Sequence, residues 1–407
     1  DFKVVSEEEK NLSKSDNTLS FDDLIILALK LLADNADTAK SYQNRFKYIS
    51  VDEYQDIDEN QYKLIRLLAP PDGNLYAIGD PNQAIYGFRG GDSKFFNNFT
   101  KDYPDADIIN LKNNYRSTGT IVNASNQIVD SYNITAKYDK PHEKITIHAA
   151  PTDKAEAEFV VSTIENLIGG HNFFSLDTAR SEGEEADLSF SDFAVLYRSS
   201  SQLEPLLEAF KRSGMPYVKL SDDLLCNKKP IVKLLSLLTD DGPVAAQLGA
   251  LNKEFTGIID ENILQYFAKL AQTYKMKSEF IHEASMLAEI DTLDKRADRI
   301  SLLTLHSSKG LEFKCVFIVG LEDGIIPFYR AKEPCEIEEE KRLLYVGMTR
   351  AEERLFLTRA VKRKWFGTYK KLAPSPFLEK IENDLLKFSR IEKALKAKEQ
   401  SKQLELF

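Results

Sequence analysis

The stretch YISVDEYQD at residues 48–56 decides the fold class of this chain. Residues 48–51 have the composition of a short buried strand, and two acids, Asp52 and Glu53, stand directly after it. An apolar run that leads into polar residues returns in LYAIGD at 75–80, IINLKNNYR at 108–116, FAVLYR at 193–198 and ISLLTLH at 300–306. Helical patterns separate these runs, at residues 58–69, 117–131, 153–168, 202–213 and 339–351. This alternation predicts an α/β protein with a parallel sheet, whose polar residues meet at the carboxyl ends of the strands.

Three other regions have different patterns. Ser20 precedes Asp23 by three residues at the start of an apolar run, which predicts a helix over 21–35. Residues 225–295 are rich in amphipathic leucine patterns and predict a helical insertion between two halves of one α/β domain. We expect a surface loop at 171–190 and a charged helix after residue 380, followed by a short tail.

Composition indicates an ordinary globular protein. The chain has 407 residues, and 54 Lys and Arg against 64 Asp and Glu give a net charge of −10, so any nucleic acid must bind at a local patch or groove. Its three cysteines are far apart and no CxxC pattern occurs, which predicts no zinc site and a reducing compartment such as the cytoplasm. No apolar run approaches the roughly 18 residues of a membrane span, and no signal peptide is visible. Because the chain starts at Asp1 and not at Met, we expect it to be a fragment.

The adjacent acids Asp52 and Glu53 fit a metal–phosphate site. One carboxylate can reach Mg²⁺ and the next can accept a proton from attacking water. Considered alone, the pair is also compatible with an acidic turn that caps the next helix. In GDPNQAIYGFRGG at residues 79–91, Gln83 can orient water near a γ-phosphate, and Tyr86, Phe88 and Arg89 alternate aromatic and cationic groups that suit stacking on single-stranded bases. A glycine-rich turn with packed aromatic side chains is the alternative.

Two further strand ends carry polar groups. Arg116 can stabilise charge on a transferring phosphoryl group and Tyr115 offers a flat face to a purine, although an arginine at a helix start is more often structural. The segment TLHSSKGLEF at 304–313 supplies His306, Lys309 and backbone N–H groups at a predicted helix start, which suits an anion, or else His306 is an ordinary turn residue. The helix at 339–351 has alternating charges typical of a solvated face, apart from Thr349-Arg350 at its end.

Taken together and in order, DEYQD, GDPNQAIYGFRGG, NYRST, TLHSSKGLEF and RLLYVGMTRAEE resemble motifs II to VI of UvrD/Rep/PcrA-type superfamily 1 DNA helicases. The resemblance covers about residues 18–225 and 296–380, and it implies two RecA-like parallel-sheet motor domains, the first incomplete, with a small helical insertion in the second. In the implied division, residues 1–47 are the end of a helical insertion of the first motor domain, and residues 48–112 are the C-terminal part of that domain. The second motor domain consists of two halves, 113–225 and 296–380, which are separated by the short helical insertion 226–295. Residues 381–407 are a charged helix and tail.

The resemblance also implies roles for individual residues. Asp52 would hold Mg²⁺, Glu53 would be the general base, and Gln83 would sense the γ-phosphate of ATP. Arg116 and Arg350 would be arginine fingers, and the other nucleotide contacts would come from Tyr115, Lys309, Gly310 and Glu312. Single-stranded DNA would bind at Tyr86, Phe88, Arg89 and His306. Many relatives have Trp at the position of Phe88. A phenylalanine ring can also stack on a base.

One departure from the family is large. A Walker A loop, GxxxxGK[ST], is expected near the N-terminus, but the Lys-Ser pairs at 14–15, 40–41 and 277–278 are not preceded by Gly. From the resemblance we expect an ATP-dependent 3′→5′ DNA helicase or translocase, present here without its P-loop segment. Because that segment is missing, we expect this chain to be inactive by itself. The main alternative is a non-catalytic module that binds DNA or a partner protein, and a helicase–nuclease subunit is a lesser one. The insertion of about 70 residues is shorter than in large family members.

Two segments suggest further contacts. The chain ends Gln403-Leu404-Glu405-Leu406-Phe407, which resembles the peptide that docks bacterial DNA-processing proteins on the sliding clamp. Residues 362–371, KRKWFGTYKK, are the most basic segment of the chain. We expect this segment near a phosphate path, with a solvated hairpin as the alternative.

Overall fold

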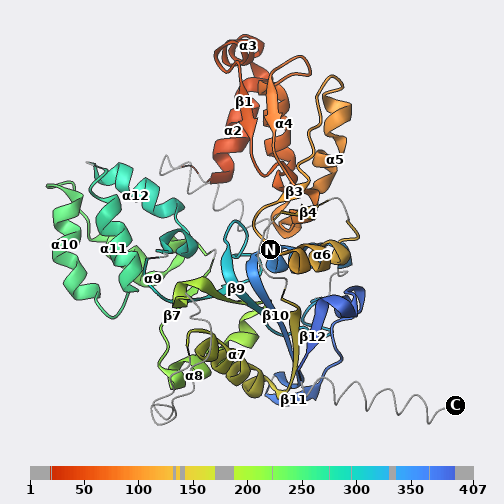
Figure 1. Cartoon of the computed structure of the whole chain (residues 1–407). Helices are drawn as coiled ribbons and strands as arrows, with labels where there is room; N and C mark the ends of the chain where they lie inside the picture. The colour runs from red at the N-terminus through yellow and green to blue at the C-terminus, as the bar shows by residue number, and fades with distance from the viewer. Residues whose placement is uncertain are drawn as a thin grey trace. The chain divides into compact units, whose positions relative to one another are not determined.

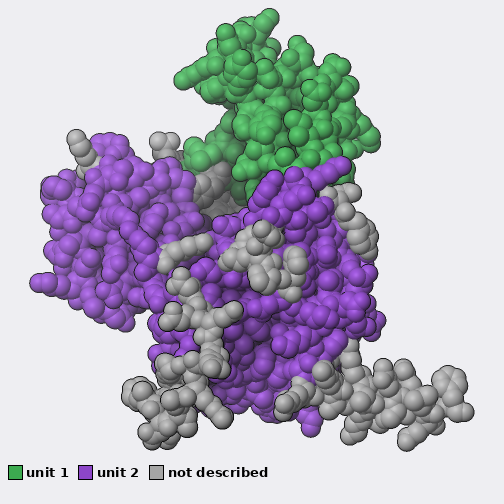
Figure 2. All heavy atoms as spheres, viewed as in Figure 1, with its two compact units in different colours: residues 1–111 green, residues 112–407 purple. Residues whose placement is uncertain are grey.

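The computed structural model describes residues 19, 21–131, 134–137, 143–169, 188–221, 223–274, 276–294, 296–329, 336–365 and 367–389. The chain divides into two compact units, residues 1–111 and 112–407, coloured separately in Figure 2. Each unit has its own parallel sheet, as the alternation of strand and helix patterns predicted.

The first unit is built on a two-stranded sheet. Its strands β1 (Ile49–Val51) and β2 (Leu75–Ala77) are parallel, and Ser50 lies opposite Tyr76. The helices are α2 (Phe21–Asp34), α3 (Ala36–Arg45), α4 (Glu59–Leu68) and α5 (Ser93–Asp102), and the short 3₁₀ helices are η1 (Tyr54–Asp56), η2 (Pro81–Gln83) and η3 (Gly87–Arg89). A small core forms around Tyr54, Ile57 and Phe95. It packs η1 against α5, and so fixes the segment that follows β1.

The second unit is built on a larger sheet, which contains the strands labelled β7, β9, β10 and β12 in Figure 1. Its strand order is β12-β5-β10-β9-β6-β8-β7. All neighbours on this path are parallel, and β11 pairs antiparallel with β10. The strands are β5 (Ile145–Thr152), β6 (Phe193–Tyr197), β7 (Tyr217–Leu220), β8 (Ile300–Thr304), β9 (Phe313–Ile318), β10 (Ala351–Trp365), β11 (Thr368–Lys371) and β12 (Leu386–Phe388). A separate short pair joins β3 (Asn113–Asn114) to β4 (Thr135–Ala136).

Helices cover both faces of the larger sheet. The helices α7 (Asp153–Leu167) and α8 (Leu203–Ser213) pack together over Phe193, Val195 and Tyr197, while Leu196 points to the other face and meets α13 (Ile337–Met348) at Gly347. The helix α6 (Gly119–Ile128) packs beside α13. Because β6 is covered on both sides, its sequence is a continuous apolar run rather than an alternating one.

The helical insertion predicted over 225–295 is confirmed. It contains α9 (Lys229–Ser236), α10 (Val244–Phe255), α11 (Glu261–Leu270) and α12 (Lys277–Met286), with η6 (Leu225–Asn227) and η7 (Glu289–Thr292) at its ends. These helices share a core that includes Leu234, Leu248, Phe267 and Phe280. The Leu225 amide donates to the Leu287 carbonyl, so the two ends of the insertion meet.

Three expectations about local structure are wrong. Residues 108–111 form no strand, and Ile109 and Leu111 are 79% and 87% exposed, because no described strand lies beside them. Residues 305–310 form successive turns before β9 instead of a helix start. The described residues after 380 form η9 (Asn383–Leu385) and the edge strand β12, not a charged helix, because Leu386 is buried beside β5. Most of the loop expected at 171–190 and the residues from 390 onward lie outside the described residues.

Candidate functional site

Asp52 and Glu53 lie at the carboxyl end of β1, as predicted, and both are exposed. The Glu53 amide donates to Asp52 Oδ1 at 2.9 Å. Glu53 has φ 51° and ψ 41°, the left-handed region that residues with a Cβ rarely adopt. Such a conformation costs of the order of 1–3 kcal/mol and concentrates at functional sites, which makes Glu53 a candidate on backbone geometry as well as on residue type.

Gln55 links the two strand ends, and sequence reasoning did not single it out. Its side chain is only 1% exposed; its Nε2 donates to Glu53 Oε2, and its Oε1 accepts from the Asp80 amide at 3.0 Å. A signal was available, because a polar residue between Tyr54 and Ile57, which are both buried, needs hydrogen-bond partners. The buried Gln55 side chain therefore holds the exposed Glu53 carboxylate through this hydrogen bond.

Gln83 belongs to the same network. Its Nε2 donates to Asp80 Oδ2 at 2.9 Å, and Asp80 Oδ1 accepts from the Asn82 amide at 2.9 Å. Gly79 leaves space for this arrangement, because a Cβ at Gly79 would lie 2.6 Å from Gln55 Oε1. The first unit thus joins three predicted residues, Asp52, Glu53 and Gln83, through Gln55 and Asp80. We call these five residues the carboxylate–amide network.

The aromatic residues after this network lie on the surface of the first unit. The rings of Tyr86 and Phe88 have centroids 6.1 Å apart, and Phe88 is 51% exposed. Gly91 is required here, because a Cβ at this position would lie 2.9 Å from the Asp56 carbonyl oxygen. The backbone of Arg89 belongs to η3, and its side chain lies outside what the structure describes.

In the second unit, Arg116 and Glu312 form an ion pair although they are 196 residues apart in sequence. Arg116 Nε donates to Glu312 Oε2 at 2.7 Å, and both side chains are partly exposed. Asn114 Oδ1 accepts from the amides of Arg116 and Ser117, each at 2.9 Å, and so fixes the start of this segment. Tyr115 is 69% exposed beside it. Two predicted residues, Arg116 and Glu312, are thus in direct contact with each other, and the exposed ring of Tyr115 is next to Arg116 in sequence.

The turns before Glu312 carry Lys309, Gly310 and His306. Thr304 Oγ1 accepts from the Ser307 amide at 3.0 Å, and the Lys309 amide donates to the His306 carbonyl at 3.1 Å. Gly310 has φ 82°, which explains the glycine at this position. The backbone path here is a series of tight turns that presents His306 and Lys309 at the carboxyl end of β8.

Arg350 is buried at the end of α13 and is 2% exposed. Its guanidinium donates to the carbonyls of Val346 and Leu311, both at 3.0 Å, and to Thr349 Oγ1 at 3.1 Å. These bonds attach α13 to the turn that carries Glu312. Its role as an arginine finger stays a prediction, since the guanidinium contacts protein oxygens in this structure.

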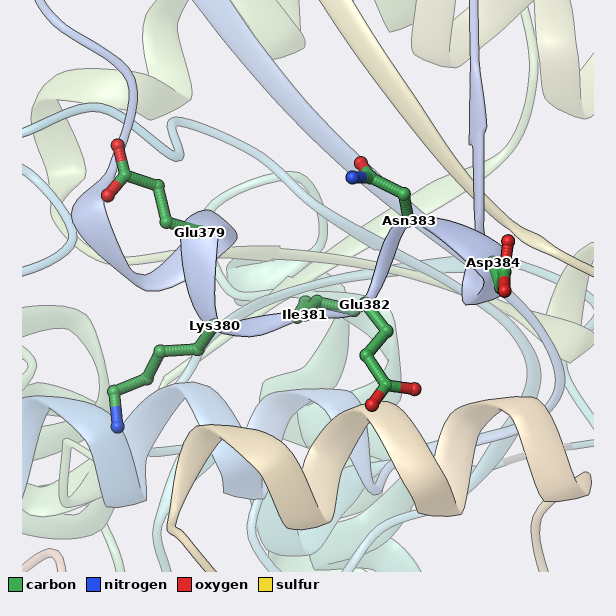
Figure 3. A pocket seen from close by; sticks show the side chains of 6 residues that line it. All are labelled: Glu379, Lys380, Ile381, Glu382, Asn383 and Asp384. Atoms are coloured by element: carbon green, nitrogen blue, oxygen red, sulfur yellow. The ribbon is translucent and has the colours of Figure 1, made fainter.

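A shallow pocket lies at residues 379–384, away from the predicted site residues in sequence (Figure 3). Lys380 Nζ donates to both carboxylate oxygens of Asp130, at 2.9 and 2.7 Å, and the Glu382 amide donates to Gln127 Oε1 at 2.9 Å. These contacts attach residues 380–382 to α6 and the residues directly after it. Lys380 and the Glu382 backbone therefore have a structural role at this pocket.

Within the described ranges, no group of three or more His, Cys, Asp and Glu side chains is arranged to hold a metal ion. Mg²⁺ is usually held by one or two carboxylates together with substrate phosphates, so Asp52 and Glu53 still fit such an ion. No helix among the described residues has the length and hydropathy that a membrane span requires.

Comparison with known proteins supplies the family. The UvrD/REP helicase N-terminal domain matches residues 2–104, and the UvrD-like helicase C-terminal domain matches 109–240 and 254–362. The ATP-dependent DNA helicase PcrA of Staphylococcus epidermidis (strain RP62A) is 30% identical over 482 residues, which cover 93% of this chain and 64% of the relative. The protein of the same name from Staphylococcus aureus (strain Mu50) is 31% identical, covering 94% and 64%.

The chain thus spans about 64% of the length of these curated relatives. A solved C-terminal domain of a possible DNA helicase from Lactobacillus plantarum covers 67% of this chain and 98% of its own, at 14% identity, but its TM-score of 0.33 is too low to support an argument. The two domain matches between them contain all the predicted nucleotide and DNA residues. The chain belongs to the UvrD-like helicase family.

Proposed function

We propose that this chain is part of an ATP-dependent DNA helicase that moves 3′→5′ on single-stranded DNA. The observation that carries the proposal is the carboxylate–amide network: Gln55 holds Glu53, and Asp80 holds Gln83, at the ends of two neighbouring parallel strands. That is the position at which α/β proteins bind their ligands. The family and the names of the relatives support the choice of ATP and DNA.

The residues of the first unit would divide the hydrolytic step between them. Asp52 would hold Mg²⁺, which when bound neutralises charge on the phosphates. Glu53 would accept the proton of the attacking water, with its Oε2 held by the amide of Gln55 so that the carboxylate keeps one orientation. Gln83, restrained by Asp80, would orient that water. The direction of movement is taken from the family alone.

The residues of the second unit would bind nucleotide and DNA. Arg116 would stabilise negative charge on the transferring phosphoryl group, and Glu312, which holds its guanidinium, would contact the ribose. Tyr115, Lys309 and Gly310 would complete the nucleotide contacts, with Arg350 as a second arginine. Single-stranded DNA would lie on Tyr86, Phe88, Arg89 and His306, where base–aromatic stacking contributes about 1–3 kcal/mol per base.

The decisive experiment measures DNA-stimulated ATP hydrolysis by the 407-residue chain and by the full-length product of its gene. The chain has no GxxxxGK[ST] sequence, so we expect it to turn over ATP negligibly. In a product that contains this loop, Glu53→Gln should lower the rate by several orders of magnitude and spare ATP binding. Glu59→Gln, on the exposed surface of α4, is the matched control.

Three outcomes are informative. Fast turnover by the 407-residue chain that depends on Glu53 would show that the phosphate loop is dispensable. Full-length protein that binds DNA without any turnover would support a non-catalytic module instead. An equal loss of ATP hydrolysis in Glu53→Gln and Glu59→Gln would show that Glu53 has no specific role in the site.

We also propose that the C-terminal peptide docks on the bacterial sliding clamp. Gln403, Leu404, Leu406 and Phe407 carry the pattern, and they lie outside the described residues. Two or three buried apolar side chains at roughly 1.5–3 kcal/mol each, less the cost of ordering the peptide, suggest micromolar affinity. A peptide of the last ten residues should bind a clamp in a titration, and Phe407→Ala should remove the signal. Equal binding by both peptides would reject the proposal.

A further inference from the structure

A largely buried ion pair joins two parts of the second unit that are 142 residues apart in sequence. Arg198 Nη2 donates to Glu340 Oε1 at 2.6 Å, and Arg198 Nε lies 3.2 and 3.3 Å from the two carboxylate oxygens. The side chains of Arg198 and Glu340 are 14% and 8% exposed. The alternating charges of residues 339–351 are typical of a solvated face, but Glu340 is buried and has a specific partner.

Phe328 contacts both members of this pair. Its amide donates to Glu340 Oε2 at 3.0 Å, and the Arg198 guanidinium lies over its ring, 5.1 Å from the ring centroid. Both oxygens of the Glu340 carboxylate therefore have partners, and these partners come from two different segments. We call Arg198, Phe328 and Glu340 the Arg198 cluster.

The backbone of Arg198 is also held in place. Gln202 is 1% exposed, and its Oε1 accepts from the amides of Arg198 and Ser199 at 2.8 and 2.9 Å. The Gln202 Nε2 donates to the Val319 carbonyl at 2.8 Å, directly after β9. Arg198 therefore offers Glu340 a fixed partner at the carboxyl end of β6.

The Arg198 cluster lies at the sheet edge that carries His306. Tyr197 is the last residue of β6, and its carbonyl accepts from the Leu305 amide at 2.9 Å. Arg198 and His306 directly follow these two bonded residues, so they leave neighbouring parallel strands at the same edge. This is the edge at which α/β proteins bind their ligands.

Helix α13 connects the Arg198 cluster with Arg350. Glu340 lies in the first turn of α13, and Arg350 follows its last turn. At 1.5 Å per residue, the helical path from Glu340 to Arg350 is about 15 Å long. The far end is attached as well, because the Arg350 guanidinium donates to the Leu311 carbonyl at 3.0 Å. A polar contact therefore fixes α13 at each end.

An ion pair at Glu340 restricts α13 more than an apolar contact would. Apolar side chains of similar volume can repack at little cost, whereas a two-point contact between arginine and a carboxylate tolerates only a narrow range of positions. A buried ion pair is weak evidence for stability, because well-packed apolar side chains often stabilise a protein equally well. We therefore expect the main contribution of Glu340 to be geometric.

We propose that Glu340 is a positioning residue for ATP hydrolysis, which holds α13 in one register on the end of β6 so that Arg350 keeps its place when DNA binds at His306. The inference rests on the proposed function, which assigns nucleotide to Arg350 and single-stranded DNA to His306. Glu340 itself would touch neither ligand, since both of its carboxylate oxygens are bonded to Arg198 and Phe328.

The test measures ATP hydrolysis by the full-length product of the gene, with and without oligo(dT). Glu340→Gln removes the charge and keeps the size of the side chain. Its DNA-stimulated kcat should fall roughly ten- to a hundredfold, because a displacement of about 1 Å can cost a hundredfold in rate. The KM for ATP and the dissociation constant of oligo(dT) should change less than about twofold, since the lost contact is made to neither ligand.

Arg198→Lys is a second variant, which keeps the positive charge but loses the planar two-point contact. It should lower the DNA-stimulated kcat by a similar factor. The double variant should be no slower than either single one, because the two residues act as one pair. The matched control is Glu338→Gln, which removes the same charge from the same turn of α13 at a side chain that is 70% exposed. Glu338→Gln should have wild-type kinetics.

Wild-type kcat in Glu340→Gln, or an equal loss in Glu338→Gln, would overturn the inference. A parallel loss of kcat, oligo(dT) affinity and melting temperature in both cluster variants would also overturn it, because it would indicate a structural role only. Weaker oligo(dT) binding in Arg198→Lys alone would assign Arg198 to DNA contact instead. Wild-type protein without DNA-stimulated hydrolysis would reject the proposed function together with this inference, whereas equal stimulation in the wild type and Glu340→Gln would reject the inference alone.

Discussion

In β6 all five side chains from Phe193 to Tyr197 are buried, whereas none of the side chains of β1 or β2 is. The sheet of the second unit is covered by helices on both faces, and its strands have neighbours along the whole path. In the first unit, Tyr48 and Tyr76 are 82% and 64% exposed. A parallel pair of two strands with so little cover is expected to be marginally stable.

This difference bears on function because both units carry predicted site residues at their strand ends. Glu53 and Gln83 stand on the two-stranded sheet, while His306 and Glu312 stand beside the large one. We therefore expect the scaffold of the carboxylate–amide network to open more readily than the large sheet. The following predictions test how large the difference between the two sheets is.

Amide hydrogen exchange should show the largest contrast. We expect amides of β6, β8 and β9 to exchange roughly a thousandfold more slowly than those of β1 and β2, because local opening ranges from almost no cost up to the global free energy of unfolding. The measurement is mass spectrometry of peptides from the intact chain. Comparable protection in both sheets would show that the first unit is as stable as the second.

Removal of one aromatic ring from each sheet should affect stability very unequally. Phe317 is fully buried and stacked on Phe356 at 4.4 Å, so Phe317→Ala should lower the free energy of unfolding of the second unit by about 3–5 kcal/mol. Tyr76→Ala, at an exposed position, should change that of the first unit by less than about 0.5 kcal/mol. Calorimetry of each variant measures both changes in the free energy of unfolding. A large loss of stability in Tyr76→Ala would show that the Tyr76 ring of β2 packs against another part of the protein.

Glycine substitutions separate packing from the site. A Cβ at Gly347 would lie 2.4 Å from Leu305 Cδ2 in the buried layer, so Gly347→Ala should destabilise the second unit by about 1–3 kcal/mol. At Gly79 a Cβ would lie 2.6 Å from Gln55 Oε1 and 2.8 Å from Phe96 Cε2, so Gly79→Ala should destabilise the first unit and also displace the amide that holds Glu53. We expect Gly79→Ala to lower hydrolysis in the full-length protein. Normal hydrolysis with an unchanged melting temperature would mean that Gln55 does not position Glu53.

The smallest effect concerns Tyr54, whose buried hydroxyl has no hydrogen-bond partner among the described residues. Tyr54→Phe should stabilise the first unit by about 1 kcal/mol, because an unsatisfied polar group no longer has to be buried. Tyr103→Phe is the matched control, and it should destabilise by about as much, since the Tyr103 hydroxyl donates to the Ala69 carbonyl at 2.7 Å.

The same residue predicts a dependence on pH. Burial raises the pKa of Tyr54 above its ordinary value of 10.0, so the folded unit favours the neutral phenol. Stability is therefore fully present below pH 10 and falls as the unfolded chain ionises above it. Tyr54→Phe should reduce this alkaline loss, as measured by thermal melts between pH 8 and about 11. An identical pH profile in the variant would show that Tyr54 does not contribute.

Local patterns predicted most of the secondary structure well, because amphipathic spacing and caps act over a few residues. The helix predicted over 21–35 is α2, at 21–34, and that predicted over 153–168 is α7, at 153–167. Prediction was wrong where an apolar run did not find the expected neighbour. Residues 108–111 lack a partner strand, and residues 386–388 join the edge of the sheet beside β5 instead of continuing a helix.

The sequence by itself determined the fold class, the family and the order of the candidate site segments, since each depends on contiguous residues. Tertiary structure alone decided which side chains hold the candidate site residues in place. Gln55 accepts from the Asp80 amide 25 residues away, Arg116 meets Glu312 across 196 residues, and Arg363 is neutralised by Glu156 and Glu322 from separate segments. Periodicity along a chain contains no information about such pairs. They form because a buried or half-buried polar group must find its partner wherever the packing of the sheet brings one within hydrogen-bond distance.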